Sequence, residues 1–414
     1  MSRLLTAALL AGALYLPAAR ADTSPVTLDE AIVRASAGAP RLQAGESAID
    51  AAKGGWTQAG VRPNPTVTVT GENLAGTGRY NVFGQSEITA SYSQTFERGD
   101  KRSARTSYAG GDIRVAEASL GVARLDLAAQ VERAYYNVII ADEIAWAAEY
   151  RLKVEREIQA EALRRVRGYK DPLFVESRAA ARVATAGANL DAAKRQQKAA
   201  RNLLASFWGG SGEGLQVVGG VLVPTTCPSS IADADEALEA AKIARAEAGV
   251  GVERSRATPD YTVSGGVRYL RGTGDFAVVT GITVPIGRYD RNQGNIDRAQ
   301  AERQQLEFEA EADRQERERR LASLCADAET ARLRADSIRL SVLPLAVKTL
   351  DQVRDGYRRG GFNFRDVQDA ADAIVQVQEQ WIAAANLWRD LQTEIDRLSG
   401  RFDAPAGGRS TNAK

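Results

Sequence analysis

The amino-acid sequence predicts a mainly helical protein with a small β part, in which long coiled-coil helices are joined to four β-strands. Three observations lead to this fold class: a duplicated unit, helical patterns too long for a compact domain, and short segments that alternate polar and apolar residues. The first unit begins at Pro63-Asn64-Pro65 and ends near Tyr169, and the second begins at Pro259 and ends near Tyr357. The matched positions are offset by 196 residues at the start and by 188 at the end. A repeat of this length indicates that each copy is one structural module.

The first 21 residues have the pattern of a secretory signal peptide. Arg3 supplies the positively charged start, Leu4 to Leu16 form an apolar run, and Ala19-Arg20-Ala21 is a small-x-small cleavage site. We therefore expect a mature chain that begins at Asp22 and works outside the cytoplasm.

The composition argues against an enzyme. The chain has no histidine, which removes the commonest metal ligand and general base. Its two cysteines, Cys227 and Cys325, are not spaced as a metal-binding knuckle. Acidic and basic residues are almost balanced, at 53 and 54, so the sequence predicts no basic surface for a nucleic acid. We expect no catalytic site, no cofactor, no metal site and no nucleic-acid partner.

The first long helical pattern follows Asp100, and no proline interrupts it before Pro172. Its apolar residues recur at alternating spacings of three and four, which is typical of the narrow seam of a coiled coil. Roughly 65 residues at 1.5 Å per residue would give a helix of about 100 Å, far too long for a compact domain. The second copy repeats the spacing, with a predicted seam at Leu321, Leu324, Ala328, Ala331, Ala335, Ile338, Val342 and Leu345.

Each long helix is expected to end at a turn that contains glycine and to be followed by a return helix. The first turn is Arg167 to Pro172, where glycine follows the helix and proline opens the next one. The second turn is Asp355 to Gly361. The other predicted helices are the two return helices, about Leu173 to Trp208 and Phe362 to Ser399, and two shorter ones, about Thr27 to Gly60 and Ala232 to Thr258.

Four segments have the alternation and length of membrane-barrel strands. In the second of them, Ile88, Ala90 and Tyr92 lie on one face and hydroxyl-rich residues lie on the other. No segment after the signal offers about 18 uncharged apolar residues, so contact with a membrane would need strands closed into a barrel. The four predicted strands are Thr66 to Asn73, Glu87 to Phe96, Tyr261 to Leu270 and Phe276 to Pro285.

Four strands cannot close a barrel by themselves, and open strand edges are not tolerated in lipid. We therefore expect the chain to form oligomers. Three copies would supply twelve strands and would bring the long helices together into a tube. Two other interpretations stay open at this point: a soluble periplasmic coiled coil, and two soluble hairpins packed on helices.

This layout resembles the outer-membrane efflux proteins, the TolC-like exit ducts of Gram-negative bacteria, over nearly the whole mature chain from Leu28 to about Gly400. The resemblance is carried by the Pro63-Asn64-Pro65 entry to the first strand, by the duplicated hairpins and by the stretch Gly356 to Ala370. The run from Val284 to Gly294 is similar to the heavy-metal branch, the cobalt-zinc-cadmium resistance outer-membrane subunits.

The resemblance implies a homotrimer in the outer membrane of a Gram-negative bacterium. A twelve-stranded pore in the lipid would continue into an α-helical barrel through the periplasm. A periplasmic adaptor would connect this duct with an inner-membrane pump of the resistance-nodulation-division class, and the duct would conduct heavy-metal cations passively. The alternatives are a duct for drug efflux or type I secretion and, less favoured, a periplasmic coiled-coil scaffold.

The resemblance also indicates a periplasmic gate. Asp366 and Asp369 match the acidic pair that narrows the closed tip in this family, and Asp372 lies three residues further along the same helix. In a trimer each residue would form a ring of three carboxylates, and such rings favour cations and repel anions. The alternative is that these are helix-start acids that complement the helix dipole.

The turns at the ends of the long helices are the expected contact points for the adaptor. Capping by glycine and by basic residues applies at the same positions, and the two roles are compatible. The residues expected to contact the adaptor are Arg167, Gly168, Tyr169, Gly356, Tyr357, Arg358 and Arg359.

The two cysteines allow a geometric argument. The rise per helical residue places Cys227 and Cys325 at similar heights along the tube. An oxidising compartment favours a disulfide. Similar height does not make the chain segments adjacent, however, so two free buried thiols are the alternative.

These elements give an expected division of the chain. Residues 1–21 are the signal peptide, 22–65 an N-terminal helix of the equatorial and tunnel region, 66–97 the first hairpin, 98–208 the first long helical hairpin with its tip near 167–172, 209–260 an equatorial connector and helix, 261–286 the second hairpin, 287–400 the second long helical hairpin with its tip near 355–362, and 401–414 a disordered tail.

Overall fold

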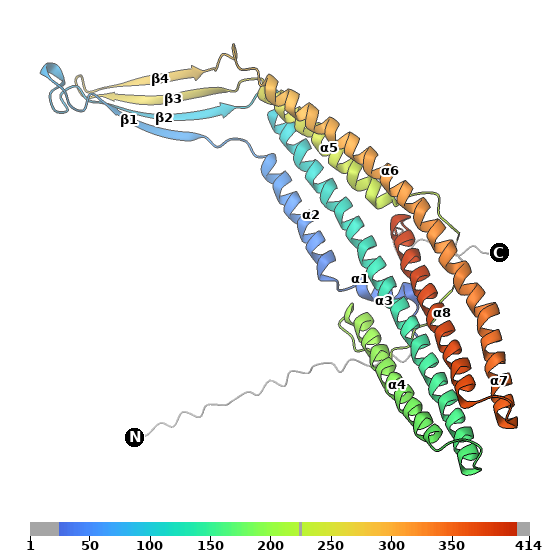
Figure 1. The fold of residues 1–414 in the computed structure, drawn as a ribbon. Helices are drawn as coiled ribbons and strands as arrows, with labels where there is room; N and C mark the ends of the chain where they lie inside the picture. The colour runs from blue at the N-terminus through green and yellow to red at the C-terminus, as the bar shows by residue number, and fades with distance from the viewer. Residues whose placement is uncertain (1–24, 223–225, 404–414) are drawn as a thin grey trace, which may run out of the picture. The chain divides into compact units, whose positions relative to one another are not determined.

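The computed structural model describes residues 25–222 and 226–403 (Figure 1). These residues divide into two compact units. Within these residues, unit 1 takes 25–37, 131–222 and 332–386, and unit 2 takes 38–130, 226–331 and 387–403. The expected signal peptide and the tail from residue 404 lie outside the described residues. The elements in chain order are α1 (Leu28–Ser36), α2 (Pro40–Ala59), β1 (Thr66–Glu72), the 3-10 helix η1 (Gly78–Tyr80), β2 (Glu87–Phe96), α3 (Lys101–Arg167), α4 (Phe174–Ser206), α5 (Asp233–Arg256), β3 (Tyr261–Leu270), β4 (Asp275–Thr283), α6 (Gln293–Ser337), the π-helix η2 (Ile338–Val342), α7 (Leu343–Arg359) and α8 (Phe364–Leu398).

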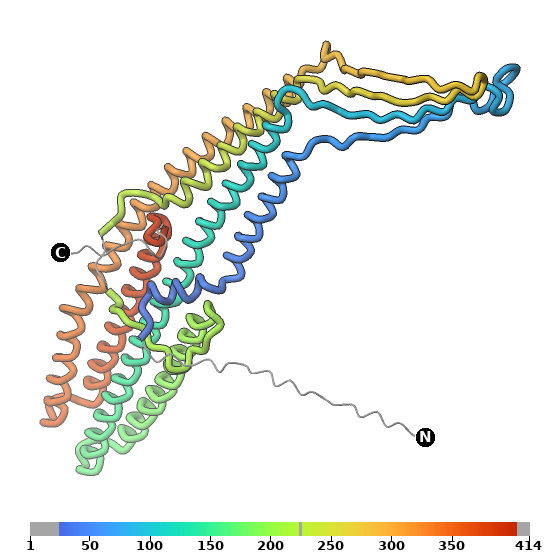
Figure 2. Tube along the Cα trace, turned by 180° about the vertical axis from the view of Figure 1, so that it is seen from behind, coloured from blue at the N-terminus to red at the C-terminus, as the bar shows by residue number. Residues whose placement is uncertain are grey.

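The four strands form one antiparallel sheet in unit 2, in the order β1-β2-β3-β4 (Figure 2). The two hairpins of the duplicated unit are joined, because β2 pairs with β3 over the full length of both strands. β4 ends at Thr283 rather than at the expected Pro285, since proline has no N–H group to donate to the ladder. Within the described chain, β1 and β4 are the two edges of the sheet.

Alternation along the strands gives this sheet two different faces. Paired residues share a face, and the register aligns Val69 with Ala90, Val267 and Val278. The opposite face consists mainly of threonine and serine side chains. Val69 and Val278 are among the most exposed large hydrophobic residues of the chain. A single chain therefore leaves the apolar face of its sheet uncovered.

The first long helix, α3, spans the whole expected pattern, with 67 residues. The three-four spacing of its apolar residues produces a buried stripe that includes Val131, Val138 and Leu152. In the described part of the chain, no helix combines the length and the apolarity that a membrane crossing requires.

The helix expected from Thr27 to Gly60 is interrupted and forms α1 and α2. Pro40 occupies the first turn of α2, and the preceding Ala39 is extended, with ψ at 117°. Proline has no N–H group and disfavours helical geometry in the residue before it, so it can begin a helix here but not continue one. Thr27 is the N-cap residue of α1, and its hydroxyl accepts the N–H of Glu30 at 3.3 Å.

The second long helical pattern is interrupted by the π-helix η2, between α6 and α7. The N–H of Leu343 donates to the carbonyl of Ile338, five residues back. Pro344 follows and lacks the N–H group that a regular α-helical ladder would use. A π-turn holds one residue more than an α-turn, so the side chains beyond it are rotated relative to those before it.

The buried seam consequently shifts by one position at η2. Val342 and Leu345 were expected in the seam, but they are 41% and 64% exposed. Leu343 and Ala346, one residue later in each case, pack against the hydrophobic core of unit 1 instead. The predicted seam is correct through Ile338 and wrong beyond it, because one extra residue turns the helix face by about 100°.

Candidate functional site

The candidate site is the pair of helix tips in unit 1, where α3 turns into α4 and α7 turns into α8. At the first tip, the N–H groups of Tyr169 and Lys170 donate to the carbonyls of Val166 and Arg165, at 3.0 and 2.9 Å. This is a Schellman motif, and its left-handed residue is Tyr169, with φ at 57°. Gly168, the glycine expected to end the helix, lies one residue before the left-handed position.

The second tip has the same bonds, but not at the expected residues. The N–H groups of Gly360 and Gly361 donate to the carbonyls of Tyr357 and Gly356, at 3.1 and 2.8 Å, and Gly360 has φ at 88°. The helix α7 therefore continues past the glycine and the tyrosine that were expected to end it. The structural counterpart of Tyr169 is Gly360, so the predicted match between Tyr169 and Tyr357 is wrong.

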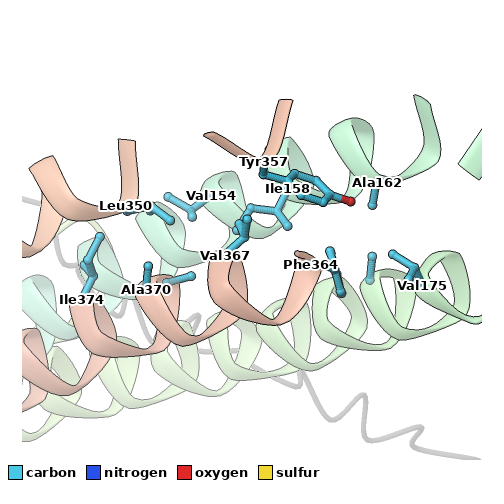
Figure 3. Packing of buried hydrophobic residues seen from close by; sticks show 12 residues of the cluster. Val154, Ile158, Ala162, Val175, Leu350, Tyr357, Phe364, Val367, Ala370 and Ile374 are labelled. Atoms are coloured by element: carbon cyan, nitrogen blue, oxygen red, sulfur yellow. The ribbon is translucent and has the colours of Figure 1, made fainter. Parts of the chain in front are cut away.

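Tyr357 is fully buried in the core of unit 1, with an exposed fraction of 0%. Its ring centroid lies 6.2 Å from that of Phe364, and the guanidinium of Arg165 lies 4.3 Å from the ring centroid. Figure 3 shows the tyrosine ring beside Ile158, within the aliphatic core formed by the ends of the helices. The expectation that Tyr357 contacts an adaptor is wrong for this structure, because the side chain has no exposed surface.

Arg165, Asp171 and Tyr357 form a hydrogen-bonded group that we call the tip network. The hydroxyl of Tyr357 donates to the carboxylate of Asp171. Arg165 donates two bonds of 3.0 Å to the same carboxylate and one of 2.6 Å to the carbonyl of Tyr357. The Arg165 bonds lower the pKa of Asp171, while burial and the neighbouring carboxylate raise the pKa of Tyr357. Asp171 therefore stays ionised and Tyr357 neutral around neutral pH.

The remaining tip residues present their side chains to solvent. Tyr169 is 99% exposed, and Arg167 is exposed beside it. Arg358 and Arg359 both bond the carboxylate of Asp355 within the same helix, and both side chains remain largely exposed. These side chains are the accessible ones among those expected to meet an adaptor.

Gly356 has a packing role instead of a capping role. A Cβ atom at this position would lie 2.2 Å from the ring of Phe362. The ring thus occupies the space that any other residue at Gly356 would need.

The expected gate residues Asp366 and Asp369 have different surroundings. Asp366 caps the start of α8: its carboxylate accepts the N–H of Asn363 at 2.8 Å, and its own N–H donates to the Asn363 side chain at 3.1 Å. Asp369 lies one turn later, is exposed, and has Arg365 at 3.8 Å. The helix-start role therefore applies to Asp366, and Asp369 presents the more accessible carboxylate.

Asp372 is bound within the chain. Arg182 of α4 donates to Asp372 of α8, with one nitrogen at 3.2 Å, and to Glu155 of α3 at 3.0 Å. Burial lowers the pKa of Arg182, but its bonds to Asp372 and Glu155 outweigh burial and the pKa is raised. The expected series of three similar carboxylates is not found, because Asp372 is paired with Arg182, which it shares with Glu155.

These internal ion pairs were not predicted from the sequence. The sequence of α3 does indicate that such ion pairs are needed, because Glu155 and Glu161 each lie three residues from the buried Ile158. A carboxylate in an apolar stripe requires a basic partner. Arg354 supplies it for Glu161, at 3.0 Å, as Arg182 does for Glu155.

Cys227 and Cys325 are joined by a disulfide in unit 2, with their Cα atoms 5.8 Å apart. The bond ties the connector before α5 to the last third of α6. Among residues 25–222 and 226–403, no group of three or more His, Cys, Asp or Glu side chains is arranged to hold a metal ion.

Residues 31–210 and 234–401 match the sequence profile of a family described as outer membrane efflux protein. The chain belongs to this family. The matched ranges contain both pairs of strands and both long helical hairpins, so the whole architecture of the efflux protein carries the assignment.

Two curated relatives of this efflux protein carry names from metal resistance. The Cobalt-zinc-cadmium resistance protein CzcC of Cupriavidus metallidurans is 30% identical over 390 residues, which cover 92% of each chain. The Nickel-cobalt-cadmium resistance protein NccC of Alcaligenes xylosoxydans xylosoxydans is 28% identical over 292 residues, which cover 68% of this chain and 64% of that protein. The resemblance to the heavy-metal branch is confirmed by these matches.

Solved structures of outer membrane channels share the fold. The outer membrane protein VceC of Vibrio cholerae matches with a TM-score of 0.72 and 18% identity, over 90% of this chain and 96% of that one. The MtrE outer membrane channel of Neisseria gonorrhoeae, in its open state, matches with a TM-score of 0.68 and 19% identity, over 90% of this chain and 88% of that one. This efflux protein thus has the fold of those channels.

Proposed function

We propose that this efflux protein is the passive exit duct of a tripartite resistance-nodulation-division efflux system and that it assembles as a homotrimer. Three sheets would join edge to edge into a twelve-stranded barrel in the outer membrane, and the long helices would form a tunnel in the periplasm. The sheet is the observation that carries this proposal. It has two open edges, one exposed apolar face and one hydroxyl-rich face. Lipid requires the apolar face and closed edges, and a water-filled lumen requires the polar face.

The proposed assembly gives each part of the chain a place. Residues 66–97 and 261–286 would supply the barrel, and 98–208 and 287–400 would supply the tunnel. Residues 22–65 and 209–260 would contribute helices and a connector to the equatorial region.

The helix tips would be the end that meets a periplasmic adaptor, which in turn contacts the pump. Arg167, Tyr169, Arg358 and Arg359 have the exposed side chains suited to this contact. Asp369 would form the ring of carboxylates at the tip, which favours the passage of cations. Tyr357 would support the tip from within the core.

Heavy-metal cations are the proposed cargo. The support comes from the relatives, whose names refer to resistance to cobalt, zinc, cadmium and nickel. The duct would contribute a path for these ions and no chemical step.

The test uses the full-length protein in its native membrane and after purification in detergent. We expect it in the outer membrane fraction, as a trimer after cross-linking, and with single-channel conductance in planar bilayers. A monomeric, water-soluble and non-conducting protein would overturn the duct. Deletion of the gene should lower tolerance to cobalt, zinc or cadmium. If tolerance to drugs falls and metal tolerance does not, the metal cargo is wrong and the drug-efflux duct replaces it.

A further inference from the structure

The charged residues of the sheet all lie at one end, where loops connect β1 with β2 and β3 with β4. We call this the loop end of the sheet. The four strands contain Glu72, Glu87, Asp275 and Arg268 and no other charged residue. Pairing places the three acidic residues side by side in the last row of the sheet. Arg268 lies two residues before the end of β3, so it is on the same face, in the next row of that face. Since paired residues and every second residue of a strand share a face, all four charges lie on the hydroxyl-rich face. We call them the mouth cluster.

Arg268 connects three strands of the sheet. Its guanidinium donates to Glu87 of β2 at 2.8 Å and lies 3.1 Å from the carboxylate of Glu72 in β1. Its third contact is the hydroxyl of Thr89, at 3.0 Å. Arg268 therefore holds the two glutamates close together and compensates one of their two charges. All three side chains remain partly open to solvent, so the remaining charge acts on the water in front of this face.

The rest of this face carries no ionic charge. Inward from the mouth cluster, β1 contributes Thr70, Thr68 and Thr66, and the paired residues of β2 are Thr89, Ser91 and Ser93. The mouth cluster, with three carboxylates and one guanidinium, has a net charge of −2 in each chain. An ion that moves along this face meets fixed charge only at the loop end of the strands.

We propose that the mouth cluster determines the ion preference at the outer end of the duct, with Arg268 setting its strength. This inference rests on the proposed function, in which the hydroxyl-rich face lines the lumen of a trimer. Three copies would place a net negative ring at the exit, which raises the local concentration of cations and repels anions. Loss of Arg268 makes the ring more negative, whereas loss of Glu72 and Glu87 makes it neutral.

The experiment is a measurement of reversal potential for the purified full-length protein in planar bilayers, under a tenfold gradient of potassium chloride. The Glu72→Gln/Glu87→Gln variant is expected to lower the ratio of cation to anion permeability roughly twofold or more, and Arg268→Gln is expected to raise it. Opposite changes from the same cluster cannot arise from a general loss of folding. Arg268→Lys, which keeps the positive charge at this position, is the matched control and should leave the ratio unchanged. Asp369→Asn measures the separate contribution of the helix tips.

The outcomes separate the inference from the proposed function. If the wild-type protein conducts and the mouth variants leave the permeability ratio unchanged, or change it in the same direction, the inference is overturned and the duct stands. If the wild-type protein does not conduct at all, the proposed function falls and the inference falls with it.

Discussion

At the scale of single residues, the two tip tyrosines show how burial separates side chains of the same type. Tyr169 is 99% exposed, whereas Tyr357 has no exposed surface and is held by Arg165 and Asp171. Tyr169 also adopts a left-handed backbone conformation, which residues other than Gly and Asn rarely adopt. Tyr357 thus stabilises the tip, while Tyr169 remains available for a partner.

Asp171 should make the stability of the tip dependent on pH. Arg165 lowers the pKa of Asp171 in the folded state, and an unfolded aspartate has a pKa of about 3.9. A lowered pKa contributes stability that is complete above about pH 4 and is lost as the pH falls toward the folded-state value. We expect Asp171→Asn to be less stable than wild type at pH 7, with a difference that shrinks below about pH 4. Urea unfolding midpoints over this range measure it, with the exposed Asp369→Asn as control. A difference that does not change with pH would contradict the prediction.

Two helical glycines of unit 1 should respond in opposite ways to replacement by alanine. In a helix, Gly→Ala usually stabilises by about 0.5–1 kcal/mol. At Gly187 nothing lies within 4 Å of the added Cβ, so we expect this gain. At Gly356 the Cβ would meet the Phe362 ring, so we expect a net loss of stability. Thermal unfolding of Gly187→Ala and Gly356→Ala compares them directly, and a gain at Gly356 would show that the ring moves aside freely.

At the scale of elements, the π-helix η2 accommodates one extra residue within an otherwise regular helix. The seam before it includes Ile338, and the seam after it includes Leu343 and Leu350. A helix without the insertion would direct a different set of side chains toward the core of unit 1. Pro344 favours the interruption at this place because it cannot donate to the ladder.

Deletion of one residue from η2 should therefore cost less stability than a deletion within α7. Leu340 is exposed, and its removal would convert the π-turn into an α-turn while the buried face of α7 keeps its orientation. Deletion of the exposed Gln352 in the regular part of α7 is the matched control, since it would rotate the following side chains by about 100°. Pro344 would then lie inside a regular α-helix, so we expect a moderate decrease in unfolding temperature for the first deletion and a larger decrease for the second. Similar losses in both would refute this account of η2.

At the scale of the whole molecule, the disulfide between Cys227 and Cys325 closes a loop that contains α5, β3 and β4. Its two ends are 98 residues apart in sequence. A cross-link over such a distance restricts the unfolded chain strongly.

Loss of this disulfide should lower the stability of the protein. We expect the Cys227→Ser/Cys325→Ser variant to lose about 2–5 kcal/mol of unfolding free energy. Denaturant unfolding of the two proteins measures the difference. Addition of a thiol reductant should reproduce the loss in wild type and have no effect on the double variant. A reductant effect of equal size in both proteins would sink the prediction.

Periodicity predicts the elements of this molecule well and their contacts poorly. α3 and the four strands follow from spacings of three-four and two, which are properties of the local sequence. The shift of the seam after Ile338 was not predicted, because a single inserted residue leaves the apolar composition unchanged. The pairing of Asp372 with Arg182 was also missed, since these residues are 190 positions apart and meet only after three helices pack. Tyr169 and Tyr357 were matched because each follows a glycine in the sequence. The residue that takes the left-handed conformation is instead set by the backbone hydrogen bonds that end each helix, and it is Tyr169 in one tip and Gly360 in the other.

The pairing of β2 with β3 has a consequence for any ring of copies. It places the hairpin of the first repeated module beside that of the second within each chain, so that the two free edges belong to different modules: β1 to the first and β4 to the second. A neighbour that joins edge to edge must therefore bring the second module beside the first one. Around a closed ring the first and second modules would therefore alternate. Every junction between modules, within a chain or between chains, would join a first module to a second one.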